Sequence, residues 1–241
     1  MISNTVMFDL DGTLLPMDQD VFTGVYFGYL AEAVAPLGYA REELIQAVWK
    51  GVRAMVANDG TRTNEEAFWD CFASLFERDV RQDIPRFDQF YREEFGRAKK
   101  ATGFDPGAAE TVAMLKDAGC RLILATNPIF PAVATEQRIR WAGLDPDDFD
   151  YMTTYENSHY SKPNPLYYTE LLNKCGISPR EAVMIGNDTV EDLAALRAGM
   201  RVFILTDCLI NTRKIALEDY PHGSWPELMK WLKQEEGNEG L

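Results

Sequence analysis

Two hydrophobic patterns divide the chain. Between residues 17 and 103, apolar positions recur every three to four residues, a spacing that predicts amphipathic helices. Asn64 is expected to cap the third helix, because Glu65 and Glu66 then occupy its first turn. Four helices with no strand between them predict a small bundle, in which aromatic stripes form the core rather than a ligand site. The predicted helices cover residues 21–37 and 42–57, a segment with Phe68, Phe72 and Phe76, and one with Phe87, Phe90, Tyr91 and Phe95.

The rest of the chain alternates between short apolar runs and helical segments. An opening strand is predicted at residues 6–8, and without a crossover helix nearby it should join the sheet of the later strands. Strands that alternate with helices imply right-handed crossovers and a parallel sheet. We therefore predict an α/β fold, with a discontinuous Rossmann-like parallel-sheet core (1–16 and 104–241) and an inserted α-helical bundle (17–103). The further strands are predicted at 121–126, 151–154, 182–185 and 202–205, with helices near 106–118, 131–143, 163–175, 190–198 and after 226.

Composition narrows the classes of partner. The chain has 241 residues, 46% of them hydrophobic, so it can bury a full core. A formal net charge of −14 disfavours binding to nucleic acid or to an anionic membrane. The four cysteines are far apart and form no CxxC pair, which favours buried thiols in a reducing compartment over a zinc site or disulfides. Without a targeting or membrane-spanning pattern, we expect a cytoplasmic monomer or homodimer.

The candidate chemistry begins at the end of the opening strand, at Asp9 and Asp11. Side chains two residues apart on a strand point the same way, whereas Leu10 between them should face apolar packing. Two carboxylates at the end of a buried strand repel each other and lose solvation, so they need a cation or a shared proton. The plain alternative is a polar strand end that runs into an Asp-Gly turn.

Further polar residues follow the later strands. Thr126 and Asn127 follow the second predicted strand, Asp188 and Asp192 come after Gly186 at the end of a later strand, and Lys162 leads into a predicted helix. In an open parallel sheet, ligands sit beyond the carboxyl ends of the strands, so these side chains should converge at one edge. Each of these residues alone is weak evidence for a site, because a threonine after a strand often caps a helix and a lysine before a proline is usually solvated. Their order along the chain favours a site.

This set of residues suits phosphoryl transfer. A carboxylate that attacks phosphorus forms a covalent aspartyl-phosphate, and the carboxylate two residues on can protonate the leaving oxygen. The phosphate needs charge neutralisation, and Mg²⁺ suits hard oxygen ligands: Asp9, Asp188 and the Asp11 backbone carbonyl. Thr126 offers a hydroxyl donor to the phosphate and Lys162 a point charge, with Asn127 beside them.

The motifs, in their order, resemble those of the haloacid dehalogenase superfamily. They are Asp9-Leu10-Asp11-Gly12-Thr13, then Thr126, then Lys162-Pro163, then the run from Gly186 to Asp192. The resemblance implies Asp9 as nucleophile, Asp11 as acid/base, Thr126 and Lys162 as phosphate binders, and Asp188 as a Mg²⁺ ligand. It also implies that Asp192 supports the metal site or Lys162, and that the helical insertion is a cap. One departure is Asn187, which stands where many members carry an acidic residue directly after glycine.

The resemblance leaves several activities open. Asp11 argues against a dehalogenase, which attacks carbon and needs no acid/base there. A phosphonate hydrolase needs a lysine in the insertion, but Lys50 is more simply solvated. We predict a Mg²⁺-dependent phosphatase of a small organic phosphomonoester; a phosphosugar mutase and a non-catalytic phosphate-binding regulator remain alternatives. Substrate specificity is expected from the insertion, where Met17, Gln19, Asp20, Lys50 and Arg53 are candidates to face the substrate.

Overall fold

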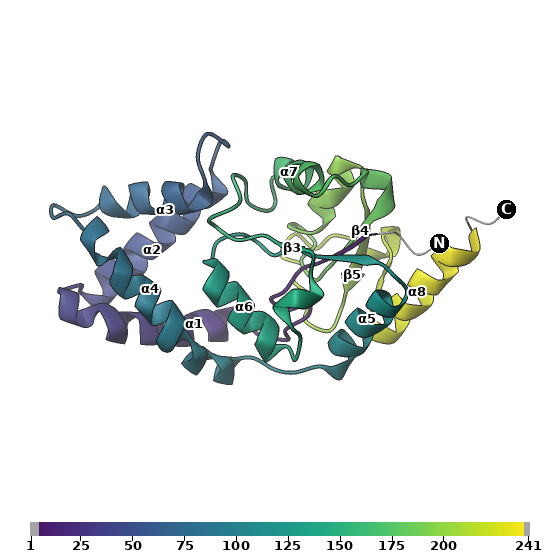
Figure 1. Cartoon of the computed structure of the whole chain (residues 1–241), viewed down its shortest axis with the longest axis horizontal. Helices are drawn as coiled ribbons and strands as arrows, with labels where there is room; N and C mark the ends of the chain where they lie inside the picture. The colour runs from purple at the N-terminus through teal and green to yellow at the C-terminus, as the bar shows by residue number, and fades with distance from the viewer. Residues whose placement is uncertain (1–4, 239–241) are drawn as a thin grey trace.

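A six-stranded parallel sheet forms the centre of the computed structural model, which describes residues 5–238 (Figure 1). The strand order is β3-β2-β1-β4-β5-β6, so the opening strand lies in the middle. This confirms the predicted parallel sheet. The strands are β1 (Thr5–Phe8), β2 (Arg121–Leu124), β3 (Tyr151–Met152), β4 (Ala182–Gly186), β5 (Arg201–Leu205) and β6 (His222–Gly223), the last of which the sequence pattern did not predict.

Helices cover both faces of the sheet because its strand residues alternate between two apolar clusters. Val6 and Phe8 pack in one cluster, whereas Met7 between them packs in the other. Figure 1 shows α7 on one side of the sheet and α5 and α6 on the other. The core helices are α5 (Pro106–Asp117), α6 (Ala132–Trp141), η4 (Pro146–Asp148), α7 (Pro165–Cys175), η5 (Pro179–Glu181), η6 (Leu193–Ala198), η7 (Leu217–Asp219) and α8 (Trp225–Asn238).

The chain between β1 and α5 is entirely helical. Its elements are α1 (Gln19–Val34), η1 (Ala35–Leu37), α2 (Arg41–Val56), α3 (Asn64–Ala73), η2 (Arg81–Asp83), α4 (Ile84–Glu93) and η3 (Phe95–Ala101). Figure 1 shows them gathered at one end of the molecule, beyond the carboxyl ends of the strands. We refer to residues 17–103 as the helical insertion. Within residues 5–238 no single helix is long and apolar enough to cross a membrane; α1–η1 and α2 meet that criterion only jointly, across a 113° bend.

Two local predictions were wrong, and a third was right only in part. Asn64 does not cap α3: the cap is Thr63, whose hydroxyl accepts from the Glu66 amide at 3.2 Å in a capping box. Phe95 does not belong to the fourth helix, because α4 ends at Glu93 and the chain continues as a 3₁₀ helix. The segment from residue 190 to 198 forms a 3₁₀ helix over its last six residues rather than an α-helix.

The helical insertion is joined to the core in two places. At its ends, Met17 and Thr102 form an antiparallel bridge, and the Gly103 amide donates to the Pro16 carbonyl at 2.7 Å. At its far side, the fully buried Asn64 side chain donates to the Pro128 carbonyl (3.1 Å) and to Ser161 Oγ (3.0 Å). The predicted boundaries at residues 16/17 and 103/104 stay a prediction, which this pairing of the two crossing segments supports.

Candidate active site

A cavity of about 280 Å³ lies between the carboxyl ends of the central strands and the helical insertion. We call its two sides the floor and the aromatic wall. Residues that follow β1, β2 and β4 form the floor, and rings from the insertion form the wall. The floor comprises Asp9, Asp11, Thr126, Asn127, Asn187, Asp188 and Glu191. The wall comprises the rings of Phe22, Tyr26, Phe27, Phe68, Trp69 and Phe87, together with the aliphatic side chains of Leu30, Val48 and Val52.

Strand register brings the floor residues together. Phe8 of β1 pairs with Leu124 of β2 on one side and with Ile185 of β4 on the other. The three strands therefore end at the same level, and the residues that follow them meet beyond the sheet edge. The Asp9 amide continues the ladder by donating to the Ile185 carbonyl at 2.9 Å.

Lys162 sits beneath the floor as a fully buried cation between two carboxylates. Its Nζ donates to Asp9 Oδ1 at 2.9 Å and to Asp192 Oδ1 at 2.7 Å. Burial raises the pKa of Asp9, an effect that the Lys162 charge opposes. Burial would lower the pKa of Lys162, but Asp192 and Asp9 raise it well above its ordinary value. Lys162 therefore offsets part of the negative charge of these two buried carboxylates, in contrast to the solvated lysine that usually precedes a proline.

Arg138 is a site residue that the sequence interpretation missed. It lies on α6, is fully buried, and forms an ion pair through Nη1 with Asp11 Oδ2. Its guanidinium also contacts Thr135 Oγ1 at 3.3 Å and lies 4.4 Å from the centre of the Phe130 ring. Burial raises the pKa of Asp11, and Arg138 opposes that rise. The two carboxylates after β1 thus have separate cations, Lys162 for Asp9 and Arg138 for Asp11.

The β4 loop explains why asparagine can stand directly after Gly186. The Asn187 side chain is buried, accepts from Thr13 Oγ1 at 3.0 Å and donates to the Cys208 carbonyl at 2.7 Å. It crosses so close to Gly12 that a Cβ there would lie 2.3 Å from Asn187 Nδ2, and Gly12 has a φ of +86°. Asn187 therefore ties the first motif to the last one.

Asp192 also lies beneath the floor, where it reaches two partners. Besides Lys162, it accepts from the Asp188 amide at 2.9 Å through Oδ2. This carboxylate would overlap any side chain at Gly186, since a Cβ there would lie 2.0 Å from Asp192 Oδ2. The DxxxD spacing thus places Asp188 on the cavity surface and Asp192 behind it.

The remaining predicted residues lie at the floor with their own partners. Thr126 is buried, and its carbonyl accepts from Thr153 Oγ1 (2.7 Å) and the Tyr167 hydroxyl (2.9 Å). Asn127 donates to Glu191 Oε1 at 2.9 Å, and burial raises the pKa of Glu191 to about 8. Asp188 Oδ1 accepts from the amides of two following residues at 2.6 and 3.0 Å, which fixes the carboxylate at the loop.

The oxygen donors at the floor fit a hard cation. Asp9, Asp188 and the Asp11 carbonyl provide carboxylate and carbonyl oxygens, and Asp11 Oδ1 is buried with no hydrogen bond from residues 5–238. Over the same residues no cluster of three or more His, Cys, Asp or Glu side chains is arranged as a metal site. Mg²⁺ does not require one, because it is typically held by one or two carboxylates with waters and a substrate phosphate. The donors present therefore fit Mg²⁺.

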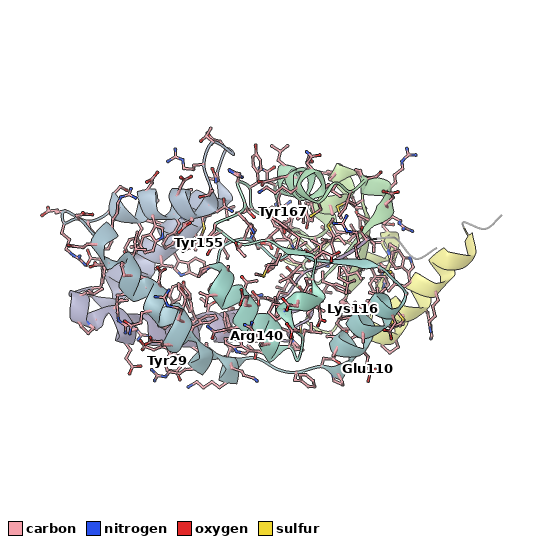
Figure 2. All side chains as sticks on the ribbon, viewed as in Figure 1. Tyr29, Glu110, Lys116, Arg140, Tyr155 and Tyr167 are labelled. Carbon is pink, nitrogen blue, oxygen red and sulfur yellow. The ribbon has the colours of Figure 1, made fainter. Side chains whose placement is uncertain are left out.

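The aromatic wall corrects two expectations about the insertion. Its rings were predicted to form a bundle core rather than a ligand site; they do belong to the main apolar cluster, but they also line the cavity. Figure 2 shows Tyr155, a core-loop residue that also lines the cavity, between the insertion and the sheet. Of the five residues expected to face the substrate, Gln19 lines the cavity, whereas the exposed Lys50 and Arg53 do not. Met17 is buried and Asp20 is exposed, and neither lines the cavity.

Comparisons with known sequences agree with this geometry. The family model described as haloacid dehalogenase-like hydrolase matches residues 4–199. A pyrophosphatase, PpaX, from Bacillus pumilus is 26% identical over 199 residues, which cover 82% of this chain and 81% of the relative. A phosphoglycolate phosphatase from Agrobacterium fabrum is 26% identical over 196 residues, 81% of this chain and 77% of the relative.

Solved structures share the fold. A 2-haloacid dehalogenase from Pseudomonas syringae pv. tomato superposes with a TM-score of 0.64 at 20% identity, over 97% of this chain and 99% of the other. The hydrolase YfnB from Bacillus subtilis, whose crystal structure is described as bound to magnesium, has a TM-score of 0.56 at 18% identity, over 95% and 97% of the two chains. At these identities the similarity extends to the arrangement of sheet and helices.

Proposed function

The chain belongs to the haloacid dehalogenase-like hydrolases, and we propose that it is a Mg²⁺-dependent phosphatase of a small organic phosphomonoester. One observation carries the proposal. Two carboxylates, Asp9 and Asp11, share the floor of one cavity, and each has its own buried cation. A dehalogenase that attacks carbon has no use for the second carboxylate, whereas a phosphatase needs it for the proton.

In the first step, we propose that a carboxylate oxygen of Asp9 attacks phosphorus. The new bond joins Asp9 to phosphorus, and the bond from phosphorus to the ester oxygen breaks. Asp11 gives its proton to the leaving oxygen, so the alcohol departs neutral. Burial raises the pKa of Asp11, whereas the Arg138 guanidinium acts to lower it.

In the second step, a water molecule replaces Asp9 on phosphorus. Asp11, now a carboxylate, accepts a proton from this water as it attacks, and the bond to Asp9 breaks to release phosphate. Lys162 and the Thr126 hydroxyl are proposed to bind the phosphate oxygens, with Asn127 beside them. Asp192 is proposed to hold Lys162 and the Asp188 loop in place, through its contacts of 2.7 and 2.9 Å.

The proposed cofactor is Mg²⁺, held by Asp9, Asp188 and the Asp11 carbonyl. When bound, it supplies positive charge that reduces repulsion between the phosphate and the carboxylate nucleophile. We further propose that residues 17–103 act as a cap that excludes water from the floor. The four free cysteines match an enzyme of a reducing compartment, and we propose the cytoplasm.

Release of inorganic phosphate from a panel of phosphomonoesters, with and without Mg²⁺, tests the proposal. We expect turnover that requires the metal and that Asp9→Asn abolishes. Asp147→Asn is the matched control, because Asp147 is exposed on η4 away from the cavity; it should retain full activity. Isomerisation of a phosphosugar with little free phosphate would indicate a mutase instead. Ligand binding without turnover of any ester would indicate a regulator.

A further inference from the structure

The composition of the aromatic wall indicates which kind of group the substrate carries besides its phosphate. It consists of rings and aliphatic side chains from α1, α2, α3 and α4, such as Phe22, Val52, Trp69 and Phe87. Apolar surface of this kind binds apolar groups because both surfaces leave water on contact.

The charge of the lining excludes a second anionic group. Five acidic residues line the cavity: Asp9, Asp11, Asp88, Asp188 and Glu191. Within residues 5–238, no lysine, arginine or histidine lines it. The two buried cations beneath the floor are already paired with carboxylates of the site. A carboxylate or second phosphate directed at the aromatic wall would therefore lose its hydration without gaining a counter-ion.

The size of the cavity limits the apolar group. An apolar cavity of about 150 Å³ is sufficient to bind benzene. The cavity here measures about 280 Å³ and also includes the phosphate end at the floor. The room left at the wall therefore suits one six-membered ring with small substituents.

We infer that the substrate is the phosphomonoester of a compact, ring-bearing apolar alcohol with no second negative charge. This inference rests on the proposed phosphatase function and adds the class of leaving group. It separates the chain from its named relatives, since pyrophosphate and phosphoglycolate each carry a second anionic group.

Benzyl phosphate and 2-phosphoglycolate form a matched pair for the test. Both are esters of a primary alcohol, and they differ in a phenyl ring against a carboxylate. We expect kcat/KM for benzyl phosphate to exceed that for 2-phosphoglycolate by at least 100-fold. Equal or better turnover of 2-phosphoglycolate or pyrophosphate would overturn the inference and leave the phosphatase proposal intact. If no ester is hydrolysed, the phosphatase proposal fails, and binding of the analogues below decides the inference.

The analogues benzylphosphonate and phosphonoacetate separate binding from chemistry. They preserve the same contrast of phenyl and carboxylate, and neither can lose phosphate. We expect benzylphosphonate to bind the Mg²⁺-loaded protein at least tenfold more tightly in calorimetry. Tighter binding of phosphonoacetate would refute the inference whether or not the protein is an enzyme.

A cation placed in the wall should reverse the preference. Val52→Arg introduces a guanidinium at a residue that lines the cavity, and we expect kcat/KM for 2-phosphoglycolate to rise at least tenfold while that for benzyl phosphate falls. The matched control is Val56→Arg, one turn further along α2, where the side chain is exposed and does not line the cavity. It should leave both values unchanged. If Val52→Arg unfolds in a melting experiment, the wild-type ranking alone decides.

Discussion

The floor and the aromatic wall face the same cavity, but the floor consists of charged and polar residues whereas the wall consists mainly of apolar side chains. At the floor, buried charges are held by buried partners, as in the chain of contacts from Asp9 through Lys162 to Asp192. In the wall, rings such as Trp69 and Phe87, whose centres lie 5.3 Å apart, pack against each other. The floor therefore fixes which bond is broken, and the wall selects what is attached to it. Substitutions on each side should separate these two roles.

The largest effect is expected at the buried cation of the floor. Lys162→Met leaves Asp9 and Asp192 buried without a counter-charge, so we expect a loss of about 3–5 kcal/mol in the free energy of unfolding. Phosphate release should fall below detection. Lys174→Met is the control, because Lys174 is partly exposed in its ion pair with Glu170 and should cost less than about 1 kcal/mol. Urea unfolding measures the loss in unfolding free energy for both variants. Equal losses would contradict the claim that Lys162 compensates two buried carboxylates.

Arg138 tests whether the two carboxylates need separate cations. Arg138→Met removes the partner of Asp11 but leaves the Asp9 pair, so we expect kcat to fall about 100-fold, the size of a lost acid/base contribution. Arg140→Met, two residues further on α6, is the control: Arg140, labelled in Figure 2, is exposed, and within the described residues its guanidinium hydrogen-bonds only to Glu136. Its kcat should stay within twofold of wild type. Initial-rate kinetics on the preferred ester would reject the assignment if the two variants behaved alike.

Asn64 tests the junction between floor and wall. Asn64→Ala removes donors from the Pro128 carbonyl and Ser161 Oγ, and we expect a loss of about 2 kcal/mol in unfolding free energy, since both acceptors are buried. Its neighbour Thr63 only caps α3, so Thr63→Ala should cost about 1 kcal/mol. Thermal unfolding distinguishes them. A larger loss for Thr63→Ala would show that the cap of α3 matters more than the junction.

The smallest stability effect is expected where a ring of the wall is displaced. At Gly51 of α2, an added Cβ would lie 2.5 Å from the Phe68 ring, so Gly51→Ala forces that ring to shift beside the cavity. We expect a net loss of about 1 kcal/mol and a several-fold rise in KM for the ring-bearing ester, with kcat little changed. Gly24→Ala is the control, because a Cβ at Gly24 would have no neighbour within 4 Å. An unchanged KM would argue against contact between Phe68 and the substrate.

Most residues of the floor were predictable because, in the sequence, polar residues stand at the ends of predicted parallel strands, where ligands bind. Asp9 and Asp11 come just after β1, and Thr126 and Asp188 follow the apolar runs of β2 and β4. Arg138 was missed because it belongs to no motif and lies in the middle of a helix. Periodicity offered one signal: Arg138 lies four residues from Ala134 and from Ala142, both fully buried, so it occupies the buried face of α6.

The aromatic wall was not predictable from periodicity. A ring that packs inside a bundle and a ring that lines a cavity produce the same apolar spacing, as Phe72 and Phe68 do on α3. Only the relative placement of four helices and the core decides which rings face the cavity. The role of Asn64 was predicted wrongly for a related reason. An asparagine that caps a helix cannot be told in the sequence from one that forms buried hydrogen bonds, and here the cap lies one residue earlier, at Thr63.

The two ends of the helical insertion meet, because Gly103 donates to Pro16 beside the bridge of Met17 and Thr102. A segment that leaves and rejoins a scaffold at neighbouring points can be lengthened, shortened or exchanged without shifting the strands. The same feature makes the insertion a natural cassette for engineering, in which a foreign helical bundle joined at residues 16 and 103 would bring its own substrate preference.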